Sequence, residues 1–143
     1  MSYATQSDAA WNGLRLITPA ADEDLSQVDR ILAALGTTTR RLPRVDDRML
    51  HRYYEHLAEN LSLPFEAHYP EVENLREEFL HGCTVVELLD PDKHVGDEFS
   101  GLFCKTRKGD FEVNLPLAEL EVSRHDPNFQ MIEDYWYWFW NWR

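Results

Sequence analysis

The stretch DPDKHVGDEFSG, residues 90–101, gathers four carboxylates into one short polar segment. They belong to Asp90, Asp92, Asp97 and Glu98. Gly96 and Gly101 allow sharp turns that leave main-chain carbonyls free to act as ligands. Calcium takes about six to eight oxygen ligands from carboxylates, carbonyls and water, so a loop of this composition could hold the ion.

The spacing within this loop is not that of an EF-hand. The fifth position counted from Asp90 is His94 rather than an acidic residue, and the twelfth is Gly101 rather than Glu. The alternative is a solvated hairpin loop in which Asp, Pro, Gly and Ser serve only as turn residues. A calcium site here would therefore have a geometry of its own.

A second set of carboxylates, Glu66, Glu71 and Glu73, lies around the sequence HYP. The chain has 143 residues and a formal net charge of −12, and most of this excess falls within residues 64–121. Crowded carboxylates repel one another, and a bound divalent cation would remove that cost. The same charge disfavours nucleic acid and anionic membranes as partners and favours cations and basic proteins.

Other combinations of reactive side chains give weaker signals. The residues that could bind zinc are His81, Cys83, His94 and Cys104. No CxxC or HxxxH spacing joins them, and small buried residues are common at such strand positions. His51 and Glu55 lie one helical turn apart, which is more typical of a surface pair than of an acid–base couple. No nucleophile or phosphate-binding motif occurs, so we predict no catalytic residues and no enzyme.

The hydrophobic pattern predicts helices at both ends of the chain and strands between them. Residues 1–17 lack a sustained period and are expected to be loose, whereas residues 18–143 are expected to form a single compact domain. Its parts would be a helical region (18–62), an acidic β-barrel region (63–124) and a C-terminal helix (126–143). Thr18-Pro19 and Asp126-Pro127 resemble helix N-caps followed by proline at the first helical position.

The middle of the chain changes from helical to strand periodicity. The segment EVENLREEFLHG, residues 71–82, allows a short helix, and four short strands are expected after it in CTVVELL, GLFCKTR, FEVNLP and LAELEV. A long first loop followed by tight turns predicts an α+β fold with a small SH3-like antiparallel β-barrel. The N-terminal helices and an aromatic C-terminal helix would pack around it.

The chain ends in the aromatic run YWYWFWNWR. One stripe of the predicted helix carries Phe129, Ile132, Trp136, Phe139 and Trp140. We predict that this helix is wedged against the barrel with its tryptophans buried, because large apolar patches are seldom left open. Exposed tryptophans would instead favour a docking surface.

Five segments of this chain resemble the small bacterial calcium-binding proteins of the CcbP type. They are LPFEA, CTVVELLDP, GLFCKTRKG, LPLAELEV and NFQMIEDYWYW, within roughly residues 48–140. LPLAELEV followed closely by NFQMIEDYWYW is the most specific part. The resemblance implies a compact α+β protein that binds Ca2+ at surface sites through carboxylates and main-chain oxygens, as a calcium buffer or in calcium signalling in the cytosol.

The primary hypothesis is therefore a non-enzymatic calcium buffer or sensor, expected as a monomer. Two cysteines and an N-terminus without a basic, apolar leader indicate a cytoplasmic protein. The expected metal ligands are Asp90, Asp92, Asp97 and Glu98 in one cluster and Glu66, Glu71 and Glu73 in a second. The rival hypothesis is a protein-interaction module whose SH3-like barrel and aromatic helix bind a basic or proline-rich partner.

Overall fold

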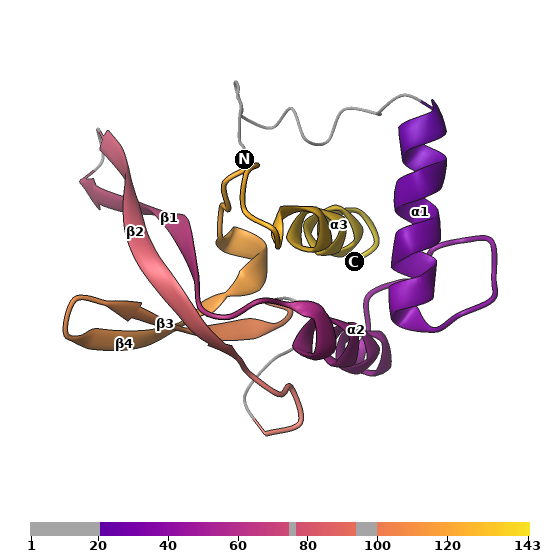
Figure 1. The fold of residues 1–143 in the computed structure, drawn as a ribbon, viewed down its shortest axis with the longest axis horizontal. Coiled ribbons are helices and arrows are strands. Elements are labelled where there is room, and N and C mark those ends of the chain that lie inside the picture. Colours follow the sequence, from indigo (N-terminus) through magenta and orange to yellow (C-terminus); the bar gives the residue numbers. More distant parts are fainter. Residues whose placement is uncertain (1–20, 75–76, 94–99) are drawn as a thin grey trace.

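The structure is a computed structural model that describes residues 21–74, 77–93 and 100–143, with side chains described for 26–69, 82–93 and 100–143. The helices are α1 (Ala21–Leu35), α2 (Asp47–Asn60) and α3 (Phe129–Asn141), with a 3-10 helix, η2 (Leu117–Glu119). The strands are β1 (Phe65–Asn74), β2 (Glu77–Leu88), β3 (Phe103–Lys108) and β4 (Phe111–Pro116). The sheet lies on one side of the molecule and the helices on the other (Figure 1). This arrangement confirms the predicted α+β class.

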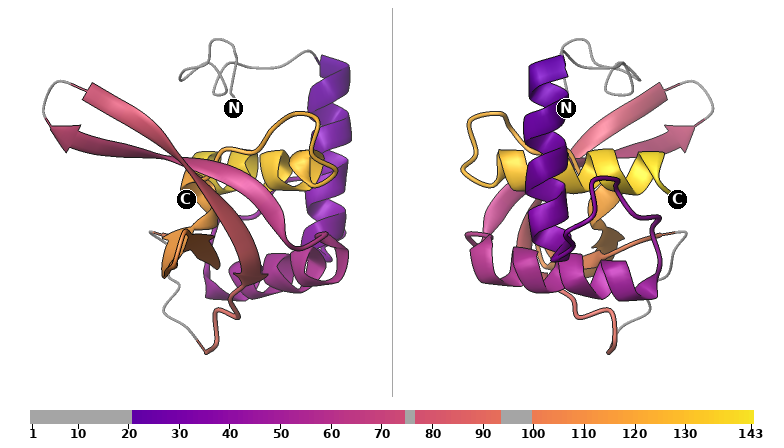
Figure 2. Two further views of the ribbon diagram at one scale, coloured as in Figure 1. Left: turned by 60° about the vertical axis from the view of Figure 1, so that its left-hand side comes forward. Right: turned by 90° about the vertical axis from the view of Figure 1, so that its right-hand side faces the viewer.

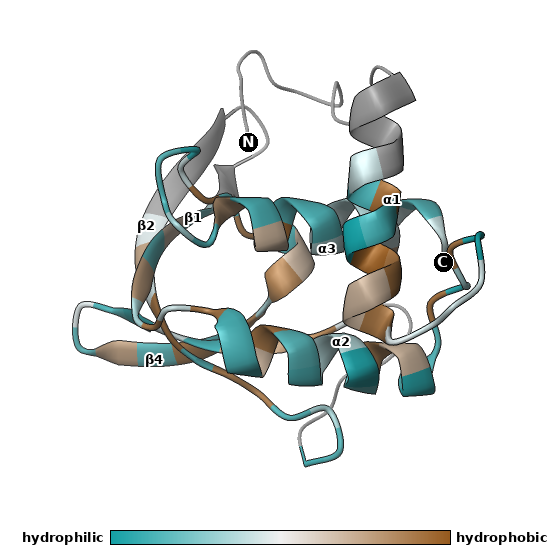
Figure 3. Ribbon diagram, turned by 45° about the vertical axis from the view of Figure 1, so that its right-hand side comes forward, coloured by the Kyte–Doolittle hydropathy of each residue, from teal (hydrophilic) through white to brown (hydrophobic). Residues whose placement is uncertain are grey.

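The end of α1 and the start of α2 carry local capping residues, whereas Thr18-Pro19 lies outside the described residues. The Asp46 carboxylate accepts a hydrogen bond from the Met49 N–H at 2.8 Å and so caps α2. Gly36 follows α1 with a φ of 66°, a conformation that glycine adopts without steric cost. The side of α2 that faces away from the core is mainly hydrophilic (Figure 3), because the buried residues Leu50 and Tyr53 lie on the opposite side.

The four strands form one antiparallel sheet in the order β1-β2-β3-β4. The prediction of a short helix over residues 71–82 was wrong, because this segment belongs to a long β1–β2 hairpin that projects beyond the other elements (Figure 2). The polar sequence of this segment does not indicate a strand. The hairpin is stabilised by cross-strand pairs such as Phe65 with Val85, which local sequence does not show. β2 is therefore much longer than the strand expected to begin at Cys83.

The sheet is open, and the SH3-like barrel is not confirmed. Among the described strands, β1 and β4 do not pair with each other. The predicted fourth strand, LAELEV, was also wrong in part, because its first residues form η2. The chain then makes one antiparallel bridge, in which His68 and Glu121 exchange main-chain hydrogen bonds of 2.9 and 2.7 Å.

The C-terminal helix begins at Phe129, later than the sequence suggested, and buries a different face from the one predicted. Asp126 does not cap it, because its carboxylate accepts a hydrogen bond from the Asn128 N–H at 2.8 Å within a preceding turn. Tyr135 and Trp138 are fully buried together with Phe139, whereas Trp140 is 39% exposed. Burial of the aromatic run is thus confirmed for its central residues, and the predicted position of the stripe is wrong for Trp140.

A single hydrophobic cluster connects α1, α2, the sheet and α3. Buried Asp134 adds a polar link, since it accepts hydrogen bonds from Arg30 at 2.7 and 3.1 Å and from Gln27 at 3.0 Å. These bonds join α3 to α1. In the described residues, no helix has the length and apolarity needed to cross a membrane.

Candidate metal centre

Asp90 and Asp92 stand in the turn that leaves the end of β2. The Asp92 N–H donates to the Asp90 Oδ1 at 2.9 Å, and the Lys93 N–H donates to the Asp90 carbonyl at 3.0 Å. This turn chemistry is what Asp, Pro and Asp favour in sequence. It brings two carboxylates close together at the protein surface, with Asp90 half-buried and Asp92 exposed.

The far end of the same loop is fixed on the core. Gly101 has a φ of 73°, and a Cβ at this position would lie 2.3 Å from the Tyr135 hydroxyl oxygen. The Leu102 N–H donates to the Tyr135 hydroxyl at 2.9 Å, and the Leu89 N–H donates to the Phe103 carbonyl at 2.9 Å. The loop therefore starts and ends at fixed points, although residues 94–99 lie outside the described part of the chain.

A third side chain reaches the same place from α2. The His51 Nδ1 lies 3.3 Å from the Asp92 Oδ2. One ligand atom each from His51, Asp90 and Asp92 lies within 4.8 Å of the others. The sequence did not reveal this neighbour, because nothing in the spacing of residues 51 and 92 indicates that α2 packs beside the loop.

The electrostatic surroundings of the cluster are negative. The pKa of Tyr54, on α2, is raised above its usual value, first by partial burial and then by the charges of Asp90 and Glu87. His51 also faces Glu55, with 3.7 Å between its Nε2 and the Glu55 Oε2, which agrees with the surface pair expected from the sequence. A cation at this position would be attracted by several carboxylates at once.

The structure does not bring all of the predicted ligands together. Asp97 and Glu98 lie outside the described residues, so their place relative to Asp90 stays a prediction. Glu66 is exposed on β1 and accepts a hydrogen bond from the Thr84 hydroxyl at 2.9 Å.

The other two members of the Glu66 set lie farther along β1. Their main chain is described, whereas their side chains are not. Five strand residues span about 16 Å of main chain, so Glu66 and Glu71 leave β1 at well-separated points. A shared ion on Glu66, Glu71 and Glu73 stays a prediction.

Asp90 and Asp92 fit calcium in the chemistry of their donors, because calcium selects carboxylate and carbonyl oxygens. Two carboxylates at one turn would supply part of the oxygen shell of a calcium ion, of which main-chain carbonyls and water commonly supply the rest. The imidazole nitrogen of His51 does not belong to such a shell. His51 is therefore chemically distinct from the other two members of the cluster.

The two cysteines have the properties of buried structural residues. Burial raises the pKa of the Cys83 thiol to about 11 and raises the pKa of Cys104 as well. Thiols that remain protonated are poor metal ligands. Neither cysteine belongs to a metal-binding cluster within the described residues, and His81 and His94 have no described side chains.

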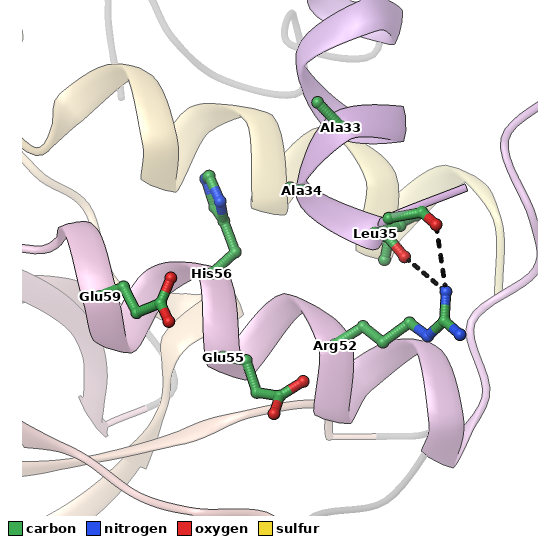
Figure 4. A pocket seen from close by; sticks show the side chains of 8 residues that line it. Ala33, Ala34, Leu35, Arg52, Glu55, His56 and Glu59 are labelled. Atoms are coloured by element: carbon green, nitrogen blue, oxygen red, sulfur yellow. Dashed lines mark hydrogen bonds between the residues drawn. The ribbon is translucent and has the colours of Figure 1, made fainter. Parts of the chain in front are cut away.

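A separate pocket of about 520 Å³ opens between the end of α1 and the exposed side of α2 (Figure 4). Arg52 occupies one side of it and donates hydrogen bonds to the Leu35 carbonyl at 3.1 Å and the Gly36 carbonyl at 3.3 Å. These are carbonyls at the end of α1 that Arg52 satisfies. The pocket is open, and the contacts of Arg52 serve helix capping.

The fold and the site together define an acidic α+β protein with a surface cluster of side chains that could bind a cation. A sequence model of the CcbP calcium-binding family, described as calcium binding, matches residues 45–139. The chain belongs to this family, which confirms the resemblance seen in the sequence, and Ca2+ is its ion. The matched region contains α2, the sheet and most of α3, whereas α1 lies before it. No curated protein and no solved structure matched the chain.

Proposed function

We propose that this protein binds calcium reversibly through the acidic loop that follows β2, as a cytoplasmic buffer or sensor without enzymatic activity. The observation that carries the proposal is the pair Asp90 and Asp92, held in one surface turn of a chain from a calcium-binding family. Asp97 and Glu98, seven and eight residues beyond Asp90 in sequence, are proposed to complete the oxygen shell. The expected affinity is that of exposed sites, about 10⁻⁶–10⁻³ M.

The second acidic set is proposed as a weaker region of cation attraction. Glu71 and Glu73 remain candidate ligands near the end of the β1–β2 hairpin. Glu66, which precedes Glu71 by about 16 Å of main chain along β1, is proposed to contribute to the same acidic region. The negative field of the chain would raise the local concentration of cations there.

An SH3-like arrangement is proposed for the β part of the chain. Its support is the sequence of η2 followed by the bridge between His68 and Glu121, which returns the chain to the edge of β1. We also propose a single compact domain over residues 18–143 and a monomer. The contacts of Asp134 with Arg30 and Gln27 support the domain assignment, because they attach α1 to the region that matches the family.

Calorimetric titration with calcium tests the proposed site. The variant Asp90→Asn/Asp92→Asn removes two charges without a change in side-chain size, and we expect calcium affinity to fall at least about tenfold, or ~1.4 kcal/mol. Asp110→Asn, at an exposed acid in the β3–β4 turn, is the matched control and should bind as the unaltered protein does. Equal calcium affinity in all three proteins would place the ion elsewhere.

The rival function, docking of a basic or proline-rich protein, has a narrower basis. The aromatic residues that would form its surface are buried at Tyr135 and Trp138, which weakens it. Among the aromatic side chains that the structure describes, Trp140 at 39% exposed and Phe111 at 78% exposed would remain available. A peptide library tested against Trp140→Ala and Phe111→Ala proteins would detect such binding as a loss in one of the two variants.

A further inference from the structure

We propose that His51, Asp90 and Asp92 form a mixed nitrogen and oxygen site for a divalent transition metal of the zinc and cobalt class. The inference rests on the proposed function in one respect, because the two aspartates are also proposed calcium ligands. The proposed transition-metal site differs from the calcium site in its ion and in the use of the His51 imidazole as a ligand. Imidazole suits zinc, nickel and related ions, whereas calcium takes oxygen ligands.

The spacing of the three residues suits a small ion. Two ligands that each stand about 2.1 Å from a tetrahedral metal lie about 3.4 Å from one another. The His51 Nδ1 and Asp92 Oδ2 are 3.3 Å apart, and the Asp90 ligand atom lies within 4.8 Å of both. Small movements of two surface aspartates would close the remaining distance.

The state of His51 gives an independent reason to expect a ligand. Its Nδ1 is shielded from solvent and makes no hydrogen bond, although the Asp92 carboxylate lies 3.3 Å away and the His51 side chain as a whole is 34% exposed. Shielded polar atoms without a hydrogen bond are few in folded proteins. A metal ion between His51 and the aspartates would satisfy this nitrogen.

Glu55 supplies the usual companion of a metal-binding histidine. Histidines that bind a metal through one nitrogen commonly donate the other N–H to a carboxylate, which fixes the tautomer. The Glu55 Oε2 lies 3.7 Å from the His51 Nε2, on the nitrogen that does not face Asp92. A proton on Nε2 would direct the free electron pair of Nδ1 toward the aspartates. Glu55 is thus a positioning residue for the proposed site.

The two ions would exclude each other, because both depend on Asp90 and Asp92. A transition metal bound through His51 would occupy the carboxylates that calcium needs. Saturating calcium would in turn lower the affinity for the transition metal. The calcium site would therefore respond to a second ion through one histidine. A calcium titration in the presence of zinc should show a lower apparent calcium affinity.

The test uses the full chain with Zn2+ for calorimetry and Co2+ for absorption spectroscopy. We expect His51→Ala to weaken Zn2+ binding about 10- to 100-fold, and Glu55→Gln to weaken it by a smaller factor. Calcium affinity should stay within about twofold in both variants, because neither the His51 imidazole nor the Glu55 carboxylate is proposed as a calcium ligand. The matched control is His125→Ala, which removes an exposed histidine from another turn.

The outcomes separate this inference from the calcium proposal. Zn2+ affinity that is equal in the unaltered and His51→Ala proteins overturns the inference, whatever calcium does. An equal loss in His51→Ala and His125→Ala overturns it too, since that indicates an adventitious ion only. If Zn2+ binding depends on His51 and the unaltered protein does not bind calcium, the transition-metal site is supported and the proposed calcium site at this loop is contradicted. Circular dichroism of each variant confirms that the fold is kept.

Discussion

Asp134 is a charged side chain that the fold buries. It is an acid in an aromatic helix, only 4% exposed, and it accepts hydrogen bonds from Arg30, Gln27 and Gln130. The charge is buried because a guanidinium and two amides replace water around it. Asp134 lies outside the apolar stripe predicted from the sequence, and the docking of α1 explains why the side chain is buried.

Asp134→Asn should therefore lower the free energy of unfolding by about 1–3 kcal/mol, since it removes the charge opposite Arg30 and leaves the shape almost unchanged. Urea unfolding measures the effect. The control Glu112→Gln breaks an exposed ion pair with Arg107 and should cost at most about 1 kcal/mol. Equal effects of the two substitutions would contradict the structural role of Asp134.

The thiols provide a second prediction for single residues. Because burial raises the pKa of Cys83 to about 11, roughly one thousandth of this thiol is ionised at pH 8. A disulfide reagent should react with the native protein slowly, at a rate that climbs with pH and shows no plateau below pH 10. Guanidinium should expose both thiols to rapid reaction. A native-state plateau near pH 8.5 would mean that the thiols are exposed.

At the scale of elements, α3 holds the end of the acidic loop in place. The contact involves Gly101, whose positive φ and missing side chain allow it to lie against Tyr135 and Phe139. The Tyr135 hydroxyl accepts the next N–H, that of Leu102. The aromatic helix thus has a role that its composition did not indicate, because it fixes one end of the proposed calcium loop.

Gly101→Ala should destabilise the protein by about 2–4 kcal/mol, because the new methyl group would overlap Tyr135 and Phe139 in addition to the backbone strain. Gly109→Ala is a matched control with the same sign of φ and nothing within 4 Å of the new methyl group, and only about 1 kcal/mol is expected. Thermal unfolding of both variants checks the difference. Similar losses would show that the contact with α3 is unimportant.

Helices and turns could be predicted from the sequence more fully than the sheet. Asp46 and Gly36 mark helix ends through local bonds and conformations, which short stretches of sequence reveal. The β1–β2 hairpin depends on pairs such as Ala67 with Cys83, sixteen residues apart in the chain. Strand length and the openness of the sheet follow from such pairings and could not be derived from local periodicity.

At the scale of the whole molecule, the family assigns calcium, and the charge of −12 favours cations in general. The fold determines which acids lie near one another. Asp90 and Asp92 could be selected from sequence because they are neighbours in a turn. His51 could not, since it reaches the loop only after α2 packs beside the sheet. Glu66 and Glu71 of β1 illustrate the opposite case, because they are close in sequence and yet leave the extended strand at separated points.

A crystal structure determined from crystals grown in calcium tests the central claim most directly. We predict a strong density peak at about 2.3–2.6 Å from carboxylate oxygens of Asp90 and Asp92, with further oxygen ligands around the ion. The same peak should be absent from crystals of the Asp90→Asn/Asp92→Asn protein. A calcium ion bound at other residues, with water alone beside Asp90 and Asp92, would contradict it.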